Sequence, residues 1–565
     1  MTHVLATADY AIIAGFFVIM LGIGWHYSGR VRSMSQFFGG GKQVPWWLGG
    51  ISFYMVSFSA LAFVMHSELA YKYGVVSFVL SWLAVPAAAL SGILFARRWR
   101  RVAETSPLEY IEARYGVGMR QGLMWLGLPT RLLDDSLKLF AIGTVVSTGL
   151  GFPFRAGVIA CAVIILGYTF MGGLWAALVA DFVQFAVLVA AVIVLPFLAV
   201  SRAGGFGAVF ERLPPDFFSL ARPADGYPFG YLLCYFTLLF LNYSTSWALA
   251  QRYYSSADDR SAKKVGLLVA GLYLIGTPIF YLPALAALVF LPGVENTKEV
   301  YPLICKTVLP LGMLGMVIAA MFSATMSTLA GDYNAVSSVL TNDLYKRFLG
   351  RNISDKHLVV VGRFNTVIVG LMVLGITLLM RELQQSKDLF DTMAKVFGLF
   401  LPPVALPMLL GMLTPRISAR GAQAGLFGGV LFGVAAFALG AHCLLGASKP
   451  FLRQAQFLTF FTSAVALVGM AAGSLLAPDA GERRERVAAF FARFRAAPAT
   501  AQPNVRTADF SFLPVIAAAI AAVGAVLIGA VLLSGQAAAG RLSIAVGCAL
   551  LLVAAGFWLA SRRIH

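Results

Sequence analysis

Asp181 is a lone carboxylate in an apolar segment of this chain. It stands in an apolar run from Leu174 to Gln184 that contains no Lys or Arg. An ionised carboxylate among apolar side chains costs free energy, so Asp181 must be protonated, paired with a cation from another segment, or bound to a cation. We therefore treat Asp181 as a functional candidate.

Hydroxyl groups gather in a second apolar segment. Ala324, Ser327 and Thr328 are spaced three and four residues apart, so a helix would place them on one face. They would offer a backbone carbonyl and two hydroxyls at one level, which suits a hard monovalent cation. Ser and Thr also pack helix against helix without any ion. One turn later, Asp332 could ligate a cation or carry a proton.

Residues 46–60 combine small and hydroxylated side chains within a third apolar run: Gly49, Gly50, Ser52, Ser57 and Ser59. This composition suits a helix that breaks inside a membrane and offers backbone carbonyls to an ion. The alternative is an unbroken helix whose hydroxyls bond to the carbonyl four residues earlier.

Four charges share one face of a fourth apolar segment. Arg131, Asp134, Asp135 and Lys138 follow one another at helical spacing, and their charges sum to zero. They could neutralise each other as Arg131–Asp135 and Asp134–Lys138 pairs. They could equally line a wet cavity and bind a solute.

The elements that must position these residues are membrane-spanning helices. Of the 565 residues, 59% are hydrophobic and 12% are charged, whereas ordinary soluble domains carry roughly 25% charged residues. Apolar runs of spanning length recur along the chain, and at roughly 20 residues per span we expect about 15 transmembrane helices. The chain is therefore predicted to be an all-α polytopic membrane protein.

The net charge of +18 does not indicate a nucleic-acid partner. The basic residues form short runs between the apolar segments, such as Arg97–Arg101, which is the pattern of the positive-inside rule. Their alternation predicts an N-terminus outside and a cytoplasmic C-terminus in the plasma (inner) membrane. No GxxxxGK[ST] loop is present in the sequence, so we expect no ATP-driven transport.

With these residues in view, the chain resembles the sodium:solute symporter family of sodium-coupled sugar, proline, pantothenate and sialic acid carriers. The resemblance covers roughly residues 8–477 and rests on several motifs in the family's order. These are Gly41-Lys42 to Pro45-Trp46-Trp47, Gly172-Gly173-Leu174 to Asp181 and Gln184, Gln251-Arg252-Tyr253, Met326 to Tyr345, and Phe390 to Gly428.

The resemblance implies a five-plus-five inverted repeat of the LeuT type. The repeats would occupy residues 46–201 and 228–414, after an N-terminal extra helix and loop at 1–45. Two peripheral helices at 420–477, a basic cytoplasmic linker at 478–511 and a helical hairpin at 512–565 would follow. Solute and ion would bind where the second and seventh spans unwind.

The family's sodium site would map onto five residues. The backbone carbonyls of Met55, Phe58 and Ala324 and the hydroxyls of Ser327 and Thr328 would ligate the coupling Na+. Some members bind a second sodium with the equivalent of Asp181 and with hydroxyls where this chain has Ala330 and Gly331. Asp181 and Asp332 are therefore candidates for a second cation or for a proton.

The solute site is expected among polar residues of the second, fourth, seventh and eleventh spans. Arg131 and Lys395 favour a carboxylate, although Lys395 could instead extend toward the membrane interface. The candidates for solute binding are Ser57, Ser59, Arg131, Asp135, Asn242, Tyr243 and Lys395.

We expect a sodium-coupled symporter, not an enzyme, that imports a small polar solute such as an organic anion or amino acid by alternating access. Its partners would be the solute, sodium and the lipid bilayer. One alternative is a proton-coupled carrier on the same fold. Another is a membrane sensor that signals through the linker at 478–511, and a channel is a third.

Overall fold

The protein is described by a computed structural model that covers residues 6–28, 34–102, 106–349, 353–383, 389–441, 450–495, 512–536 and 538–564. In these ranges the chain is helical, and β structure is limited to two isolated bridges, Val44 with Ser256 and Arg222 with Tyr227. This agrees with an all-α membrane protein, because a helix satisfies its own backbone hydrogen bonds without water.

The helices of the first half are α1 (Thr7–Ser28), α2 (Met34–Gly39), α3 (Trp46–Ser57), α4 (Ala60–Tyr73), α5 (Val76–Trp82), α6 (Ala84–Ser91), α7 (Arg97–Val102), α8 (Glu109–Tyr115), α9 (Val117–Leu150), α10 (Phe154–Val192), α11 (Leu195–Arg202) and α12 (Phe206–Arg212). A π-helical turn, Gly92–Ala96, joins α6 to α7.

The helices of the second half are α13 (Phe229–Thr245), α14 (Trp247–Tyr254), α15 (Asp259–Phe290), α16 (Val300–Val308), α17 (Met313–Val339), α18 (Lys346–Leu349), α19 (Asp355–Leu383), α20 (Leu389–Leu413), α21 (Ala419–Ala441), α22 (Ala455–Leu476), α23 (Glu482–Arg495), α24 (Phe512–Leu533) and α25 (Arg541–Ile564).

Eleven helices of the described residues are long and apolar enough to cross a membrane, or 13 if each of two bent pairs counts as one span. The expected count of about 15 is not confirmed. The two remaining apolar runs both form helices. One is α9, whose charged turn lowers its hydropathy, and the other is Phe154–Gly167, which is short for a span.

Two spans break in the middle. The second span bends by 63° between α3 and α4, where Phe58 and Ser59 are extended, with φ −124° and −127°. The seventh bends by 52° between α13 and α14 at Ser246. The helical hydrogen-bond ladder is interrupted at these breaks, so carbonyl oxygens there can face a ligand.

Helix α17 forms the centre of the bundle, and every one of its residues is buried. It packs against α1, α3, α9, α10, α14 and α19. Its neighbour α10 divides into two helices at Gly173, which has a φ of 58°. A Cβ there would lie 2.6 Å from the Phe37 ring, so only glycine fits this break.

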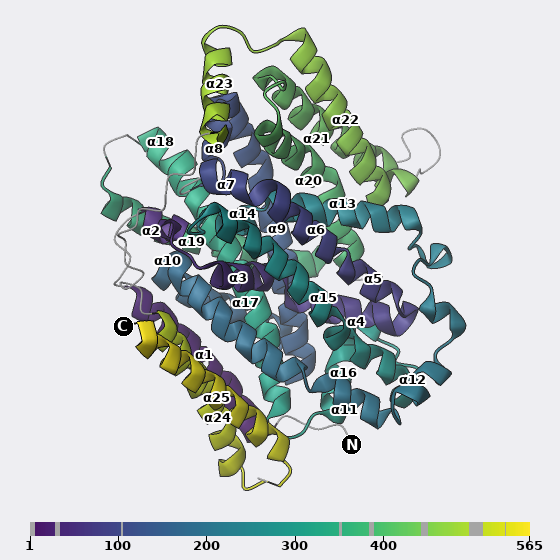
Figure 1. Cartoon of the computed structure of the whole chain (residues 1–565). Coiled ribbons are helices and arrows are strands. Elements are labelled where there is room, and N and C mark those ends of the chain that lie inside the picture. Colours follow the sequence, from purple (N-terminus) through teal and green to yellow (C-terminus); the bar gives the residue numbers. More distant parts are fainter. Residues whose placement is uncertain are drawn as a thin grey trace.

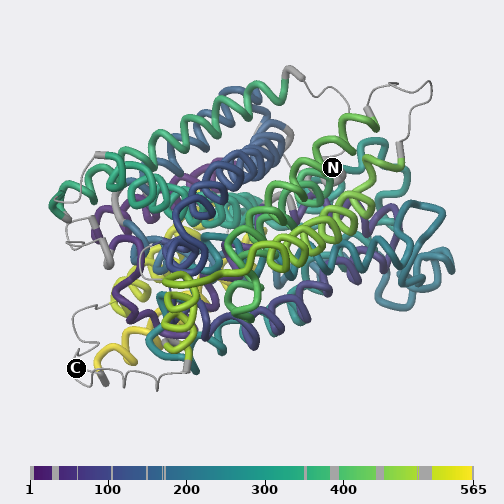
Figure 2. Tube along the Cα trace, turned by 90° about the horizontal axis from the view of Figure 1, so that it is seen from above, coloured from purple at the N-terminus to yellow at the C-terminus, as the bar shows by residue number. Residues whose placement is uncertain are grey.

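The C-terminal helices lie on the outside of the bundle. Helices α24 and α25 pack together, and α24 covers α1 and α10 (Figure 1). Helices α21 and α22 lie side by side along another edge, as the view from above also shows (Figure 2). The short helix α23 packs on α7 and α8 (Figure 1).

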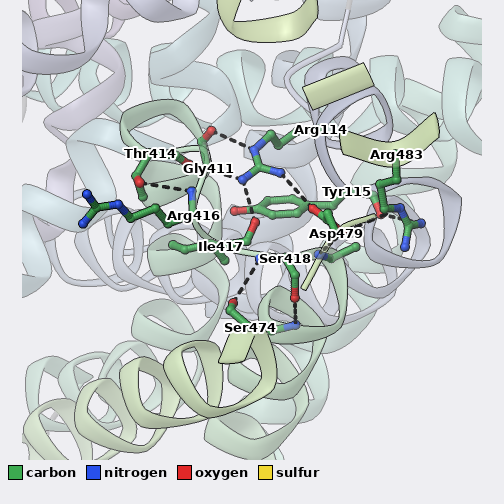
Figure 3. A network of polar contacts seen from close by, with 12 residues as sticks. Arg114, Tyr115, Gly411, Thr414, Arg416, Ile417, Ser418, Ser474, Asp479 and Arg483 are labelled. Carbon is green, nitrogen blue, oxygen red and sulfur yellow. Dashed lines mark hydrogen bonds and ion pairs between the residues drawn. The ribbon is translucent and has the colours of Figure 1, made fainter. Parts of the chain in front are cut away.

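A buried arginine connects α8 to the segment before α23 (Figure 3). The Arg114 guanidinium donates to the carbonyls of Gly411 and Ile417, at 3.3 and 2.6 Å, and lies 3.7 Å from Asp479 Oδ2. Its side chain has no exposed surface. One charged group therefore holds α8, the end of α20 and the segment before α23 together.

Candidate functional site

The Thr328 hydroxyl lies where the broken second span meets α17. Its Oγ1 is 3.3 Å from the carbonyl oxygen of Met55, 3.2 Å from that of Phe58 and 2.9 Å from that of Ala324. Two of these carbonyls come from the α3–α4 break and the third from α17 itself. The structure thus brings four of the five expected sodium ligands to one point, as a set of neutral oxygens that suits a monovalent cation.

The fifth expected ligand, Ser327, points to Asp181. Ser327 Oγ donates to Asp181 Oδ1 at 2.6 Å, and the Ser52 hydroxyl donates to Asp181 Oδ2. The carboxylate of α10 therefore orients a hydroxyl next to the carbonyl set, as outer partners commonly do for metal ligands.

Asp181 also has a cationic partner from another helix. Arg252 Nη2 of α14 lies 3.6 Å from Asp181 Oδ2, and neither side chain has exposed surface. Arg252 further donates to Ser52 Oγ at 3.0 Å and to the Gln251 side-chain oxygen at 2.9 Å. The sequence left three possibilities for Asp181: protonation, pairing with a cation from another segment, or binding of a cation. In the structure it is paired with a cation from another helix.

A cavity of about 130 Å³ opens beside Thr328. Its wall contains five of the expected solute residues, from α3–α4, α9 and α13 and their breaks: Ser57, Ser59, Arg131, Asn242 and Tyr243. Thr328 and Asp332 of α17 also line it. The cation ligands and the cavity therefore share a wall, so an ion at Thr328 would lie close to a bound solute.

Hydrogen bonds order part of this wall. Arg131 Nη1 donates to Asn242 Oδ1 at 3.5 Å, a long bond that spans α9 and α13. The Ser57 hydroxyl donates to the Tyr54 carbonyl at 2.9 Å and lies 3.1 Å from the Tyr273 hydroxyl. These polar groups face the cavity among aromatic rings, as in many small-molecule sites.

The charges on α9 pair differently from the expectation. Lys138 Nζ lies 2.8 Å from Asp134 Oδ2, as predicted, but it also contacts Asp135 Oδ1 at 3.2 Å and Asp332 Oδ2 of α17 at 2.9 Å. The predicted Arg131–Asp135 pair is wrong, because Lys138 reaches Asp135 while Arg131 turns to Asn242 and the cavity. The contact of Lys138 with Asp332 could not be predicted from spacing within one helix, because Asp332 lies on α17.

Two of the expected solute residues lie away from this cavity wall. Asp135 is fully buried behind it. Lys395 lines a different cavity, with Tyr231 of α13 and Arg453 and Gln454 just before α22.

Sequence reasoning missed Arg252 and Tyr273 as members of the site. The missed signal for Arg252 was Asp181 itself, since a buried carboxylate without a cation in its own helix requires one from elsewhere. Tyr273 carried no comparable signal, because it is one of many aromatic residues in apolar helices.

The chain is similar in sequence to known sodium-coupled transporters. The sodium/glucose cotransporter 2 of Rattus norvegicus is 26% identical over 76% of this chain and 71% of its own length. The sodium/sialic acid symporter SiaT of Proteus mirabilis (strain HI4320) is 24% identical over 77% of this chain and 90% of its own.

A solved structure of a Na+-coupled sialic acid symporter in a substrate-bound outward-open state matches with a TM-score of 0.73. It is 21% identical and covers 84% of this chain and 99% of the other. This likeness confirms the expected fold class, an all-α membrane protein of the LeuT type. A family model, the sodium:solute symporter family, matches residues 37–429. The chain belongs to the sodium:solute symporter family.

Proposed function

We propose that this protein imports a small organic anion or amino acid, driven by Na+ bound at Met55, Phe58, Ala324, Ser327 and Thr328. Family membership already makes it a sodium-coupled membrane transporter, with a role in transport rather than catalysis. The observation that carries the assignment of the ion site is the convergence of three backbone carbonyls on the Thr328 hydroxyl.

The ion ligands suggest how sodium would act on the fold. Met55 and Phe58 belong to the broken second span, while Ala324, Ser327 and Thr328 belong to α17. An ion held by both elements favours the conformation in which they are close, and it shifts the population by its differential affinity. Because the cavity lies against the same break, sodium would complete the solute site before the outer gate closes.

Arg131 supports a carboxylate as the solute's anchoring group. Its guanidinium reaches the cavity, where its hydrogen bond to Asn242 is long at 3.5 Å. A guanidinium matches a carboxylate with two parallel hydrogen bonds, which gives both affinity and orientation. Ser57, Asn242 and Tyr243 would then bind the polar remainder of the solute.

The test is the melting temperature of detergent-purified protein as NaCl replaces choline chloride at constant ionic strength. A ligand that binds only the folded state stabilises it by RT ln(1 + [L]/Kd), about 2.7 kcal/mol at 100 times Kd. We expect a sodium-specific rise in the wild type and none in the Ser327→Ala/Thr328→Ala double variant.

Ser323→Ala is the matched control. Ser323 is a buried hydroxyl of the same helix, and it donates at 2.8 Å to the Ala319 carbonyl within α17. This variant should keep the full response to sodium. Coincident sodium and choline curves in the wild type would contradict the ion assignment.

A further inference from the structure

Three carboxylates meet at one lysine beside the cavity. Oxygens of Asp134, Asp135 and Asp332 lie within 4.8 Å of one another. Lys138 Nζ contacts all three, at 2.8, 3.2 and 2.9 Å. All three aspartates are buried. The cluster joins two central helices, because Asp332 belongs to α17 and the other residues belong to α9.

The charges of this cluster do not balance. Asp134, Asp135 and Asp332 carry three negative charges when ionised, against the positive charges of Lys138 and of Arg131, which acts electrostatically on Asp332. One negative charge therefore remains inside the membrane-spanning bundle. An uncompensated charge at that depth is expensive, so one further positive charge is needed.

One carboxylate oxygen of the cluster, on Asp135, lacks a hydrogen-bond partner among the described residues. Its Oδ2 atom is buried and has no hydrogen-bond partner among the described residues, although Oδ1 is held by Lys138. Asp134, Lys138 and Asp332 line the cavity, whereas Asp135 lies outside its lining and has no exposed surface. A cationic group of a solute would enter the cavity and meet Asp134 and Asp332, which line it, rather than Asp135. A proton is small enough to reach a carboxylate outside the lining.

We propose that Asp135 and Asp332 share one proton, which makes this carrier a protein that binds a proton as well as sodium. The proton comes from the surrounding solution and binds to an oxygen of one carboxylate. The resulting hydroxyl donates to the facing carboxylate, and no other bond changes. The oxygens of the three carboxylates lie within 4.8 Å of one another, so their negative charges repel, and Lys138 and Arg131 offset only two of the three; one shared proton removes the excess.

The proton also sets the charge that a solute meets. The groups that act on the pair are Arg131, Asp134 and Lys138 of α9 and the Tyr333 hydroxyl of α17. With the proton bound, the cluster is neutral; without it, one negative charge remains beside Arg131. If the solute is an anion, as in the proposed function, its affinity therefore falls as the pH rises, because like charges repel.

The experiment detects the proton directly by infrared spectroscopy of the full-length protein in lipid membranes with NaCl. A protonated carboxyl group has its own carbonyl stretch, which shifts in heavy water. The variants Asp135→Asn and Asp332→Asn each remove the excess negative charge, because two carboxylates then remain beside Lys138 and Arg131. We expect the wild type to show the band at neutral pH and both variants to lose the same component.

The control is Asp225→Asn, an exposed loop carboxylate paired with Arg222 at 2.6 Å, which should keep the band. A band unchanged in both cluster variants would overturn the proposal. The sodium-specific melting shift, measured on the same variants in detergent, shows that each variant is folded. If the wild type shows no sodium-specific melting shift, the sodium assignment is refuted. The infrared band would still test the shared proton independently.

Discussion

At the scale of residues, the Asp181–Arg252 pair is the interaction whose loss should cost most. Both side chains have no exposed surface and lie 3.6 Å apart. Removing one partner leaves the other charge buried and unpaired, which costs roughly 3–5 kcal/mol. We expect Arg252→Ala to lower the melting temperature strongly. Arg252→Lys should restore only part of the lost stability, since the compact ammonium group of lysine cannot reach Ser52 and Gln251 at the same time as a guanidinium does.

The double variant Asp181→Ala/Arg252→Ala separates the charge from the packing. It removes both ions, so it should be more stable than Arg252→Ala alone. If the double variant melts at the same temperature as Arg252→Ala or at a lower one, Arg252 contributes to stability through its packing rather than through its charge. All of these samples can be compared by thermal unfolding in the same detergent.

The expected sodium ligands followed from the family resemblance, and the spacing within one helix and one break was consistent with them. Ser327 and Thr328 share a helix face with Ala324, and the glycines and serines of residues 46–60 indicated a broken helix. The partner of Asp181 was not predictable in this way. Arg252 lies on α14, and only the packing of the bundle brings that helix against α10 and α3.

At the scale of elements, close packing of α15 against α6 and the π-helical turn after it depends on two facing glycines, Gly266 and Gly92. A Cβ on Gly266 would lie 2.6 Å from Gly92 Cα and 2.8 Å from the Ala88 carbonyl oxygen. Both contacts are with backbone, which cannot rotate away. Gly266→Ala should therefore push the helices apart and cost roughly 1–3 kcal/mol. A lower melting temperature is the expected result.

Gly271 provides the matched control on the same helix. A Cβ there would meet nothing within 4 Å, so Gly271→Ala should keep or raise the melting temperature by improving helix propensity, by up to about 1 kcal/mol. Equal melting temperatures for the two alanine variants would contradict the close approach at Gly266.

Helix positions were largely predictable, whereas the interruptions were predictable only where residue types indicated them. Apolar runs in the sequence predicted α13, α15 and α17. A helix in a membrane is apolar on its lipid-exposed face as well as on its buried face, so it appears as a continuous apolar run. Helix α10 divides at Gly173, the second of two adjacent glycines. The π-helical turns Gly92–Ala96 and Leu340–Tyr345 had no sequence signal, because they adjust one helix to its neighbours.

At the scale of the whole molecule, the regions after α22 fall into two groups by what they contact. Helix α24 covers α1 and α10, where Phe512 packs against Trp47 and Trp175, with ring centroids 5.9 and 6.1 Å apart. The contact of α1 with α17 is independent of it, since the Asp9 carboxylate accepts from Gly315 N at 2.8 Å. By contrast, Asp479 neutralises the buried Arg114.

Two shortened chains should therefore behave differently. A chain that ends at Arg495 lacks α24 and α25, but lipid can replace their apolar surface on α1 at little cost. It should keep the sodium-specific melting shift, which would argue against a sensor whose ion response requires the final hairpin. A chain that ends at Leu476 also lacks Asp479 and leaves Arg114 without its counter-ion. It should melt at a clearly lower temperature.

Asp479→Asn in the full-length chain isolates the charge. It keeps α23, α24 and α25 but removes the negative partner 3.7 Å from the Arg114 guanidinium, so it should reproduce much of the loss seen in the chain that ends at Leu476. If the chain that ends at Arg495 loses its sodium response, then α24 and α25 belong to the transport unit. In that case their contact with α1 reaches the ion site through the packing of α1 on α17.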